Sequence, residues 1–143
     1  MTLMAKVNQK KKRDYQRLSD FRYQLRCFLR ASEDLCRAQG VTPLQYQLLL
    51  QIIGSPEREW ATIGELAERL QAKHHGVVAL VDRCEKLALV ERQPGRSDRR
   101  QVEVHLLPKG MTLVETLAAQ HQPELTLLVR AFPDVDKGGE GAA

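Results

Sequence analysis

The hydrophobic pattern changes its period in the middle of the chain, and this change constrains the fold more than any other feature. Residues 62–70 and 74–87 have the three- and four-residue apolar spacing of short helices, with a tight connection between them. Residues 89–93 and 101–107 are strand-like, and the second segment alternates apolar and polar side chains. A Pro-Gly pair follows the first of these strands and favours a turn. The order predicts a helix-turn-helix followed directly by a β-hairpin with a charged tip.

Longer helices are predicted on both sides of this segment. Residues 14–39 carry an apolar stripe at helical spacing, and Gly40 is placed to close that helix in the left-handed conformation. A second helix is predicted over Pro43–Ile53, because a threonine N-cap, a proline and a capping-box glutamine stand at its start. Residues 109–130 again have helical spacing, although Pro123 should kink or divide this last helix.

Length and composition fit one mainly helical domain. The chain has 143 residues, of which 43% are hydrophobic, 28% charged and 5% aromatic, a profile that predicts a folded, soluble protein. We expect a basic flexible arm over 1–13, a single domain over 14–132 and a disordered, glycine-rich tail over 133–143. The expected fold class is mainly α with a small β-hairpin wing.

The charge of the chain allows an anionic partner without requiring one. The formal net charge is +4 and the pI about 9.1, and the excess lies in two short stretches, 10–13 and 92–100. The three cysteines, Cys27, Cys36 and Cys84, are an odd number without metal-ligand spacing, and no long apolar span or signal peptide is evident. We therefore expect a protein of the reducing cytoplasm that does not bind a membrane.

Residue patterns for catalysis and metal binding are missing from the sequence. No glycine loop between a strand and a helix, no Ser/His/Asp or Cys/His constellation and no pair of inward carboxylates can be named. His74 and His75 are adjacent, but neighbouring helical residues diverge by about 100°, so one ion rarely binds both. His105 and His121 lie in unrelated segments. We expect no enzyme activity, no metal and no cofactor.

Specific residues, in addition to the order of elements, agree with a known family. The chain contains six short motifs in series: Gly40–Pro43, Leu66–Leu70, Leu80–Arg83, Leu89–Arg92, Asp98–Arg100 and Leu107–Gly110. This series resembles the MarR family of bacterial regulators over roughly residues 14–130, and an ordered series is far more specific than a lone helix-turn-helix. The resemblance implies a winged helix-turn-helix over 61–107 and a homodimer held by helices within 14–60 and 108–132. Two such lobes would place recognition helices in successive major grooves of a pseudo-palindromic site on double-stranded DNA.

The resemblance also implies which residues contact DNA. The family's wing motif, an aspartate, any residue and an arginine, falls on Asp98 and Arg100, so Arg100 would enter the minor groove while Asp98 holds it in position. Further implied contacts lie at the start of the recognition helix, along that helix and in the wing: Lys73, His74, His75, Gly76, Ala79, Arg83, Arg96 and Arg99. The alternative interpretation of the wing is a solvated hairpin tip whose charges serve solubility.

Some positions depart from the family pattern. Relatives often carry serine or threonine at the positions of His75 or Gly76 and a longer polar or basic residue at that of Ala79, so this helix offers few groups for reading bases. Ala88 replaces a glycine that commonly caps the recognition helix, and Leu107 replaces a threonine that commonly caps the next one. Each of these two replacements should lower local stability.

The function that the resemblance implies is that of a sequence-specific regulator of transcription. It would be a repressor, released from its operator when a small aromatic or anionic ligand binds. The ligand pocket would be lined by the first two and the last helices, with Arg22, Arg26 and Tyr46 as polar contacts. Two alternatives remain open: a winged-helix adaptor with weak DNA binding, and a regulator that senses redox state through Cys27 or Cys36.

Overall fold

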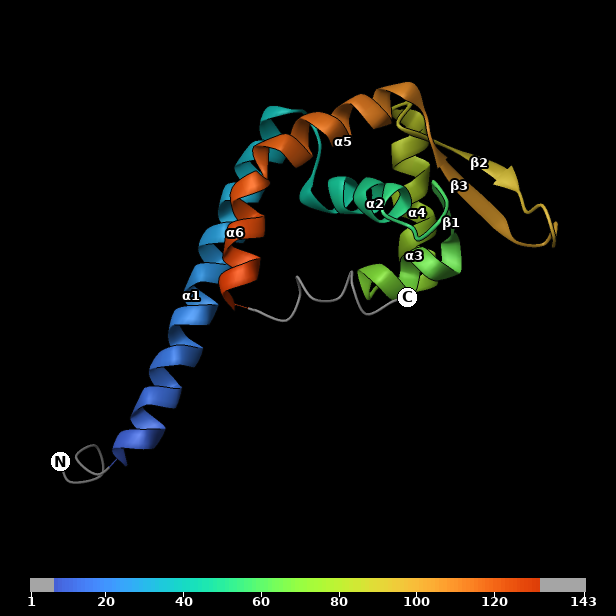
Figure 1. Ribbon diagram of the computed structural model, residues 1–143. Helices are drawn as coiled ribbons and strands as arrows, with labels where there is room; N and C mark the ends of the chain where they lie inside the picture. The colour runs from blue at the N-terminus through green and yellow to red at the C-terminus, as the bar shows by residue number, and fades with distance from the viewer. Residues whose placement is uncertain (1–6, 132–143) are drawn as a thin grey trace. The chain divides into compact units, whose positions relative to one another are not determined.

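The computed structural model describes residues 7–131, except the side chains at 125, 127, 128 and 131. Within this range the chain is mainly helical with a small antiparallel sheet, which confirms the predicted fold class (Figure 1). It divides into two compact units, a central one over Leu35–His121 and a second one made of the segments before and after it. The elements are α1 (Gln9–Ala38), α2 (Pro43–Ile53), β1 (Trp60–Thr62), α3 (Ile63–Leu70), α4 (His74–Lys86), β2 (Val90–Pro94), β3 (Val102–Leu106), α5 (Pro108–Gln120) and α6 (Gln122–Ala131).

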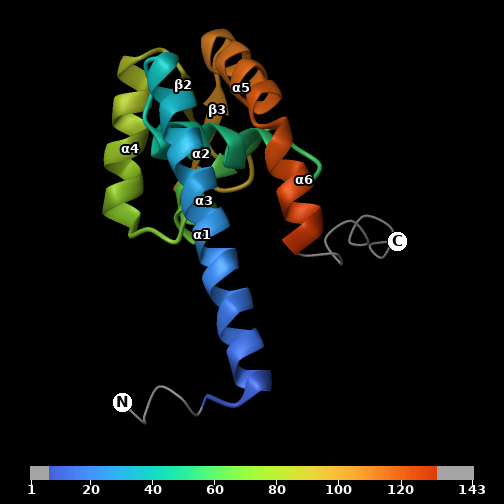
Figure 2. The ribbon, with the colours of Figure 1, turned by 90° about the vertical axis from the view of Figure 1, so that its left-hand side faces the viewer.

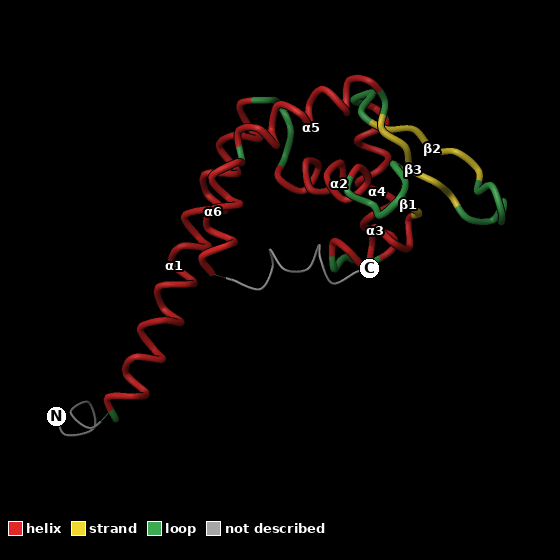
Figure 3. The backbone as a smooth tube through the Cα atoms, viewed as in Figure 1, coloured by secondary structure: helices red, strands yellow, loops and turns green. Residues whose placement is uncertain are grey.

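The sheet lies in the central unit and contains one strand more than predicted. Strands β2 and β3 form the predicted hairpin, with Val90 opposite Leu106. The additional strand β1 pairs antiparallel with β3, with Trp60 opposite His105, so β3 is the middle strand (Figure 3). The predicted hairpin is confirmed, and β1 was not predicted because a strand of three residues is too short to show alternation in the sequence.

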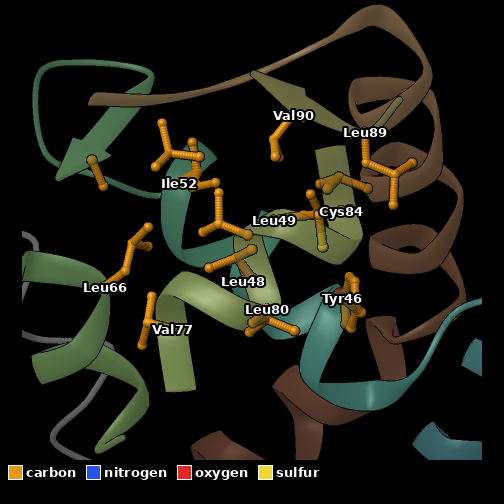
Figure 4. Close-up of a cluster of buried hydrophobic side chains, with 14 of the residues drawn as sticks. Tyr46, Leu48, Leu49, Ile52, Leu66, Val77, Leu80, Cys84, Leu89 and Val90 are labelled. Carbon is orange, nitrogen blue, oxygen red and sulfur yellow. The ribbon is translucent and has the colours of Figure 1, made fainter. Parts of the chain in front are cut away.

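The hydrophobic core of the central unit gathers around α2. Side chains from α2, α3, α4, α5 and the strands meet there (Figure 4). The largest fully buried aliphatic side chains are Leu48, Leu49, Ile52, Leu66, Leu89, Leu117, Val77, Val81, Val90 and Val104. Burial of one such side chain stabilises the fold by about 1.5–3 kcal/mol. The core thus fixes the two helices of the helix-turn-helix to the sheet that carries the hairpin.

Two capping boxes begin helices where the sequence predicts them. Oγ1 of Thr42 accepts a hydrogen bond from the Gln45 N–H at 3.1 Å, and the Gln45 side chain accepts one from the Thr42 N–H at 3.0 Å. Thr62 and Glu65 form the same reciprocal pair at the start of α3, at 3.2 and 3.3 Å. Gly40 follows α1 with a φ of +76°, which confirms the predicted left-handed closure.

The basic segment near the N-terminus is helical where a flexible arm was predicted. Helix α1 begins at Gln9, so the predicted arm over 1–13 is wrong for residues 9–13. The Asn8 side chain accepts a hydrogen bond from the Lys10 N–H at 2.9 Å, and the Asn8 carbonyl accepts one from the Lys12 N–H at 2.8 Å. Asparagine favours helix starts, and lysine, arginine and glutamine have high helix propensity. Residues 1–6 and the predicted disordered tail over 133–143 lie outside the described residues.

Pro123 coincides with the predicted division of the last helix. Helix α5 ends at Gln120 and α6 begins at Gln122. Pro123 lies in the first turn of α6, where its missing N–H removes no helical hydrogen bond. The intervening His121 donates its backbone N–H to the Leu117 carbonyl at 3.0 Å, which completes the last turn of α5.

The second unit contains most of α1, together with α6. Helix α1 runs without a break from Gln9 to Ala38 (Figure 2). Large apolar side chains are exposed along it, namely Tyr15, Leu18, Phe21, Tyr23, Leu25 and Leu29. Among the residues that the structure describes, no helix is long and apolar enough to cross a membrane.

Candidate functional site

Helix α4 has one buried and one exposed face. Its buried face packs into the core through Val77, Leu80, Val81 and Cys84. The predicted recognition residues are all exposed: Lys73, His74, His75, Gly76, Ala79 and Arg83. The N-cap Lys73 makes no side-chain hydrogen bond to the helix, so the first N–H groups keep their partial positive charge without a capping oxygen. An anion such as a phosphate is the ligand that this end of the helix would accept.

An arginine from the hairpin fixes α4 against the sheet. Nη2 of Arg92, in β2, lies 2.7 Å from Oδ1 of Asp82. Arg92 also pairs with Glu85 and donates to the Val78 carbonyl at 3.3 Å. Its side chain is only 29% exposed. The sequence analysis counted Arg92 only among the basic residues of the hairpin, whereas the structure shows that it binds α4. The available signal was the pair of acidic residues three positions apart on α4, Asp82 and Glu85.

The tip of the wing is a closed loop that presents Arg100 to solvent. The Gly95 N–H donates to the Gln101 carbonyl at 2.9 Å, which joins the two ends of the loop. Oδ1 of Asp98 accepts hydrogen bonds from the backbone N–H and from Nε of Arg100, at 3.0 and 3.2 Å. Because Nε is the atom held and the side chain is 93% exposed, the outer edge of the guanidinium faces solvent. Arg99 is exposed beside it.

A buried carboxylate lies at the base of the wing, and sequence reasoning did not identify it. Glu103 of β3 is 2% exposed. One carboxylate oxygen accepts a hydrogen bond from the Arg96 N–H at 3.1 Å, and the other lies 2.9 Å from Nε2 of His105. Burial alone would raise the pKa of Glu103, but hydrogen bonds from His105 and the Arg96 N–H, with the charges of both residues, hold that pKa below its ordinary value. Strand alternation predicts only that the Glu103 side chain points away from the core, and no sequence pattern predicts that this side chain is buried.

Aromatic and basic side chains line the same face of the sheet. The Trp60 ring stacks on the His105 imidazole, with centroids 6.1 Å apart and planes at 24°. The Arg58 guanidinium lies 4.0 Å from the centre of the Trp60 ring, and that of Arg96 lies 5.9 Å from it. Nε of Arg96 is 3.8 Å from Glu103, and the Arg96 side chain is 74% exposed. The backbone of Arg96, a predicted DNA contact, therefore lies at the base of the wing, and its guanidinium group is accessible to solvent.

The residues predicted to hold a small ligand are not brought together within one unit. Tyr46 is buried in the central unit, where its ring stacks on His121 at 4.9 Å and 21°. Arg22 and Arg26 are exposed on the part of α1 that belongs to the second unit. The central unit has a cavity of about 440 Å³, and none of these three residues lines it. Its walls are Gln39, Gly40, Val41, Leu87, Leu89, Lys109, Thr112, Leu113 and Thr116.

The three cysteines occupy different environments. Cys27 is exposed on α1, whereas Cys36 and Cys84 are buried. Burial raises the pKa of Cys84 to about 11, as expected for a thiol of the core. Within residues 7–131, no group of three or more His, Cys, Asp or Glu side chains could hold a metal ion.

Known proteins share both the sequence pattern and the fold. The MarR family pattern matches residues 39–101. The HTH-type transcriptional regulator YsmB of Bacillus subtilis is 36% identical over 73 residues, or 51% of this chain and 50% of YsmB. The transcriptional repressor MdtR of the same organism is 32% identical over 82 residues, or 57% of this chain and 50% of MdtR. The chain thus spans about half the length of the curated relatives it matches.

The fold is shared over nearly the whole length of solved structures. A cysteine-to-serine mutant of MarR from E. coli, solved in complex with operator DNA, superposes with a TM-score of 0.64 at 20% identity. The match covers 90% of this chain and 87% of that one. At this identity the likeness demonstrates the fold alone, and the family pattern and the two relatives supply the sequence link. With its winged helix-turn-helix and these sequence matches, the chain is similar to the MarR family over residues 39–101.

Proposed function

We propose that this chain is a sequence-specific, DNA-binding regulator of transcription that acts as a homodimer. The observation that carries the proposal is the wing tip, where Asp98 holds Nε of an exposed Arg100. A narrow minor groove concentrates negative potential and attracts a guanidinium group held in this way. The same compact unit exposes the N-terminal end of α4, with Lys73 at its start, to phosphates and base edges. The operator DNA bound to the E. coli MarR mutant supports the same class of partner.

The exposed stripe on α1 supports the homodimer. Leu18, Phe21, Leu25 and Leu29 recur at helical spacing and are all at least 40% exposed. A stripe of this kind is typical of an interface, and a second copy of the chain would cover it. A two-fold dimer would then present two recognition helices to half-sites about one helical turn apart.

We further propose repression that a small aromatic or anionic ligand relieves, in the cytoplasm. The name of the relative MdtR supports the repressor role. Arg22, Arg26 and Tyr46 remain the proposed ligand contacts, and Tyr46 must leave its stack with His121 to become accessible. A ligand that binds only this opened state would shift the population toward a lobe spacing that misfits the operator.

Two other functions have an observation in their favour. Gly76 and Ala79 occupy the exposed face of α4 without a polar side chain, which favours an adaptor with weak DNA binding. Cys27 is exposed and could be oxidised, which favours a redox-sensing regulator. Cys36, the other thiol considered for sensing, is buried.

Binding to duplexes selected from genomic DNA tests the proposal. Fluorescence anisotropy at 100 and 200 mM salt should show specific binding that weakens with salt. Arg100→Ala should weaken binding to the selected duplex about tenfold. The matched variant Arg99→Ala should weaken binding to all duplexes by the same factor and lower the slope of affinity against salt by about one. Equal, weak binding to selected and unrelated duplexes would favour the adaptor. Loss of binding in peroxide that Cys27→Ser prevents would favour the redox sensor.

A further inference from the structure

We propose that Glu103 is a positioning residue for DNA binding, because its buried carboxylate holds the wing loop in the shape that presents Arg100. The inference rests on the proposed DNA-binding function. Glu103 itself is 2% exposed, so it would act through the loop and would not touch the duplex.

The wing loop is attached to the protein at both of its ends. At its start, the Arg96 N–H donates to the Glu103 carboxylate at 3.1 Å. The Gly95 N–H donates to the Gln101 carbonyl at 2.9 Å, so the start and the end of the loop are joined. Within the loop, Asp98 bonds both the backbone and the side chain of Arg100. Release of Arg96 would therefore loosen the turn on which the Arg100 guanidinium depends.

The surroundings of Glu103 hold its carboxylate in one orientation. Its second oxygen lies 2.9 Å from Nε2 of His105, whose ring stacks on Trp60. The register places Gln93 of β2 and Thr62 of β1 opposite Glu103, one on each side of β3. A buried carboxylate is costly unless hydrogen bonds satisfy it, so the loop and the carboxylate stabilise each other.

Two substitutions of Glu103 distinguish the loss of its hydrogen-bond acceptor from a change in side-chain volume. Glu103→Leu keeps a similar volume but offers no oxygen to the Arg96 N–H. Glu103→Gln keeps a carbonyl oxygen for that N–H and an amide that can face His105. Glu115→Gln, on the exposed face of α5, is the matched control for loss of one acidic charge.

The experiment measures the affinity of folded variants for the selected duplex, in the wild-type and Arg100→Ala backgrounds. Glu103→Leu should weaken binding about tenfold in the wild-type background and cause no further loss when Arg100 is already alanine. Glu103→Gln should restore affinity to within about threefold of wild type. If Glu103→Leu does not fold, Glu103→Asp makes the same test, because it keeps the charge but withdraws the oxygens by one methylene.

Amide hydrogen exchange gives a readout that does not depend on DNA. The Arg96 amide should be protected in the wild type and in Glu103→Gln and exchange fast in Glu103→Leu, while core amides such as that of Val81 stay protected. An equal loss of affinity from Glu103→Leu in both backgrounds, or no rescue by Glu103→Gln, would overturn the proposal. A wild type that binds no selected duplex would refute the DNA-binding function, whereas an unprotected Arg96 amide in the wild type would refute the contact with Glu103.

Discussion

Replacement of Gly110 by alanine should destabilise the protein because the first turn of α5 lies directly on the backbone of Leu89. A Cβ at position 110 would be 2.1 Å from the Leu89 carbonyl oxygen and 3.0 Å from the carbonyl carbon. That oxygen also accepts a hydrogen bond from the Leu107 N–H at 2.9 Å. It cannot move away from the added methyl group without weakening this bond. The contact joins α5 to the segment between α4 and β2, so the strain would fall on the winged helix itself.

Three contributions set the size of the effect. Overpacking against backbone costs about 1–3 kcal/mol, and a weakened buried hydrogen bond adds about 1 kcal/mol. Alanine gains about 1 kcal/mol over glycine in a helix. The free energy of unfolding should therefore fall by about 2 kcal/mol in Gly110→Ala.

Urea denaturation followed by circular dichroism measures this change, at one fixed protein concentration because the proposed dimer would make stability depend on concentration. Gly64→Ala in α3 is the matched control, since nothing lies within 4 Å of the added Cβ. The control should gain about 0.5–1 kcal/mol from helix propensity. Equal stabilities of the two variants, or a Gly110→Ala protein at least as stable as the wild type, would show that the added Cβ does not strain the contact with Leu89.

Further predictions concern single groups. Ala88 has a φ of +59°, so Ala88→Gly should raise the free energy of unfolding in urea by about 0.5–1 kcal/mol; a loss would contradict this. Iodoacetamide followed by peptide mass spectrometry should modify exposed Cys27 first, while Cys84, buried and with its pKa raised to about 11, should react only after unfolding. The lowered pKa of Glu103 means that its ionised form stabilises the fold above the unfolded value of about 4.3, and that this contribution is lost as the pH falls through the lower, folded value. The stability difference between wild type and Glu103→Gln should therefore shrink from about pH 5 to pH 3, and a constant difference would contradict it.

Local sequence rules predicted the starts of α2 and α3 well because a capping box marks each of them. Thr42 and Thr62 each stand three residues before a side chain that completes a capping box, and both boxes form. The three-residue strand β1 has no such signature, since its pairing with β3 depends on a partner more than forty positions away. The helical start at Gln9 was missed because a run of basic residues was interpreted as a solvated arm, although such residues also form helices readily.

The candidate site likewise contains residues that a local motif predicts and residues whose roles depend on tertiary contacts. The Asp98–Arg100 pair follows from a local motif, and the hydrogen bonds between them confirm the predicted support of the arginine. The role of Arg92 depends on acidic residues of another element, and the buried carboxylate of Glu103 depends on a backbone N–H of the wing loop. Contacts of this kind are set by tertiary packing, which periodicity within one strand does not reveal.

DNA binding through the wing can be measured as the specificity ratio of the wild-type protein. The affinity for a duplex selected from genomic DNA is divided by the affinity for the same duplex with its sequence shuffled, at one stated salt concentration. We expect a ratio of about a thousand or more for the wild type, reduced about tenfold in Arg100→Ala. A ratio near one for the wild type, or a ratio that Arg100→Ala leaves unchanged, would contradict this expectation.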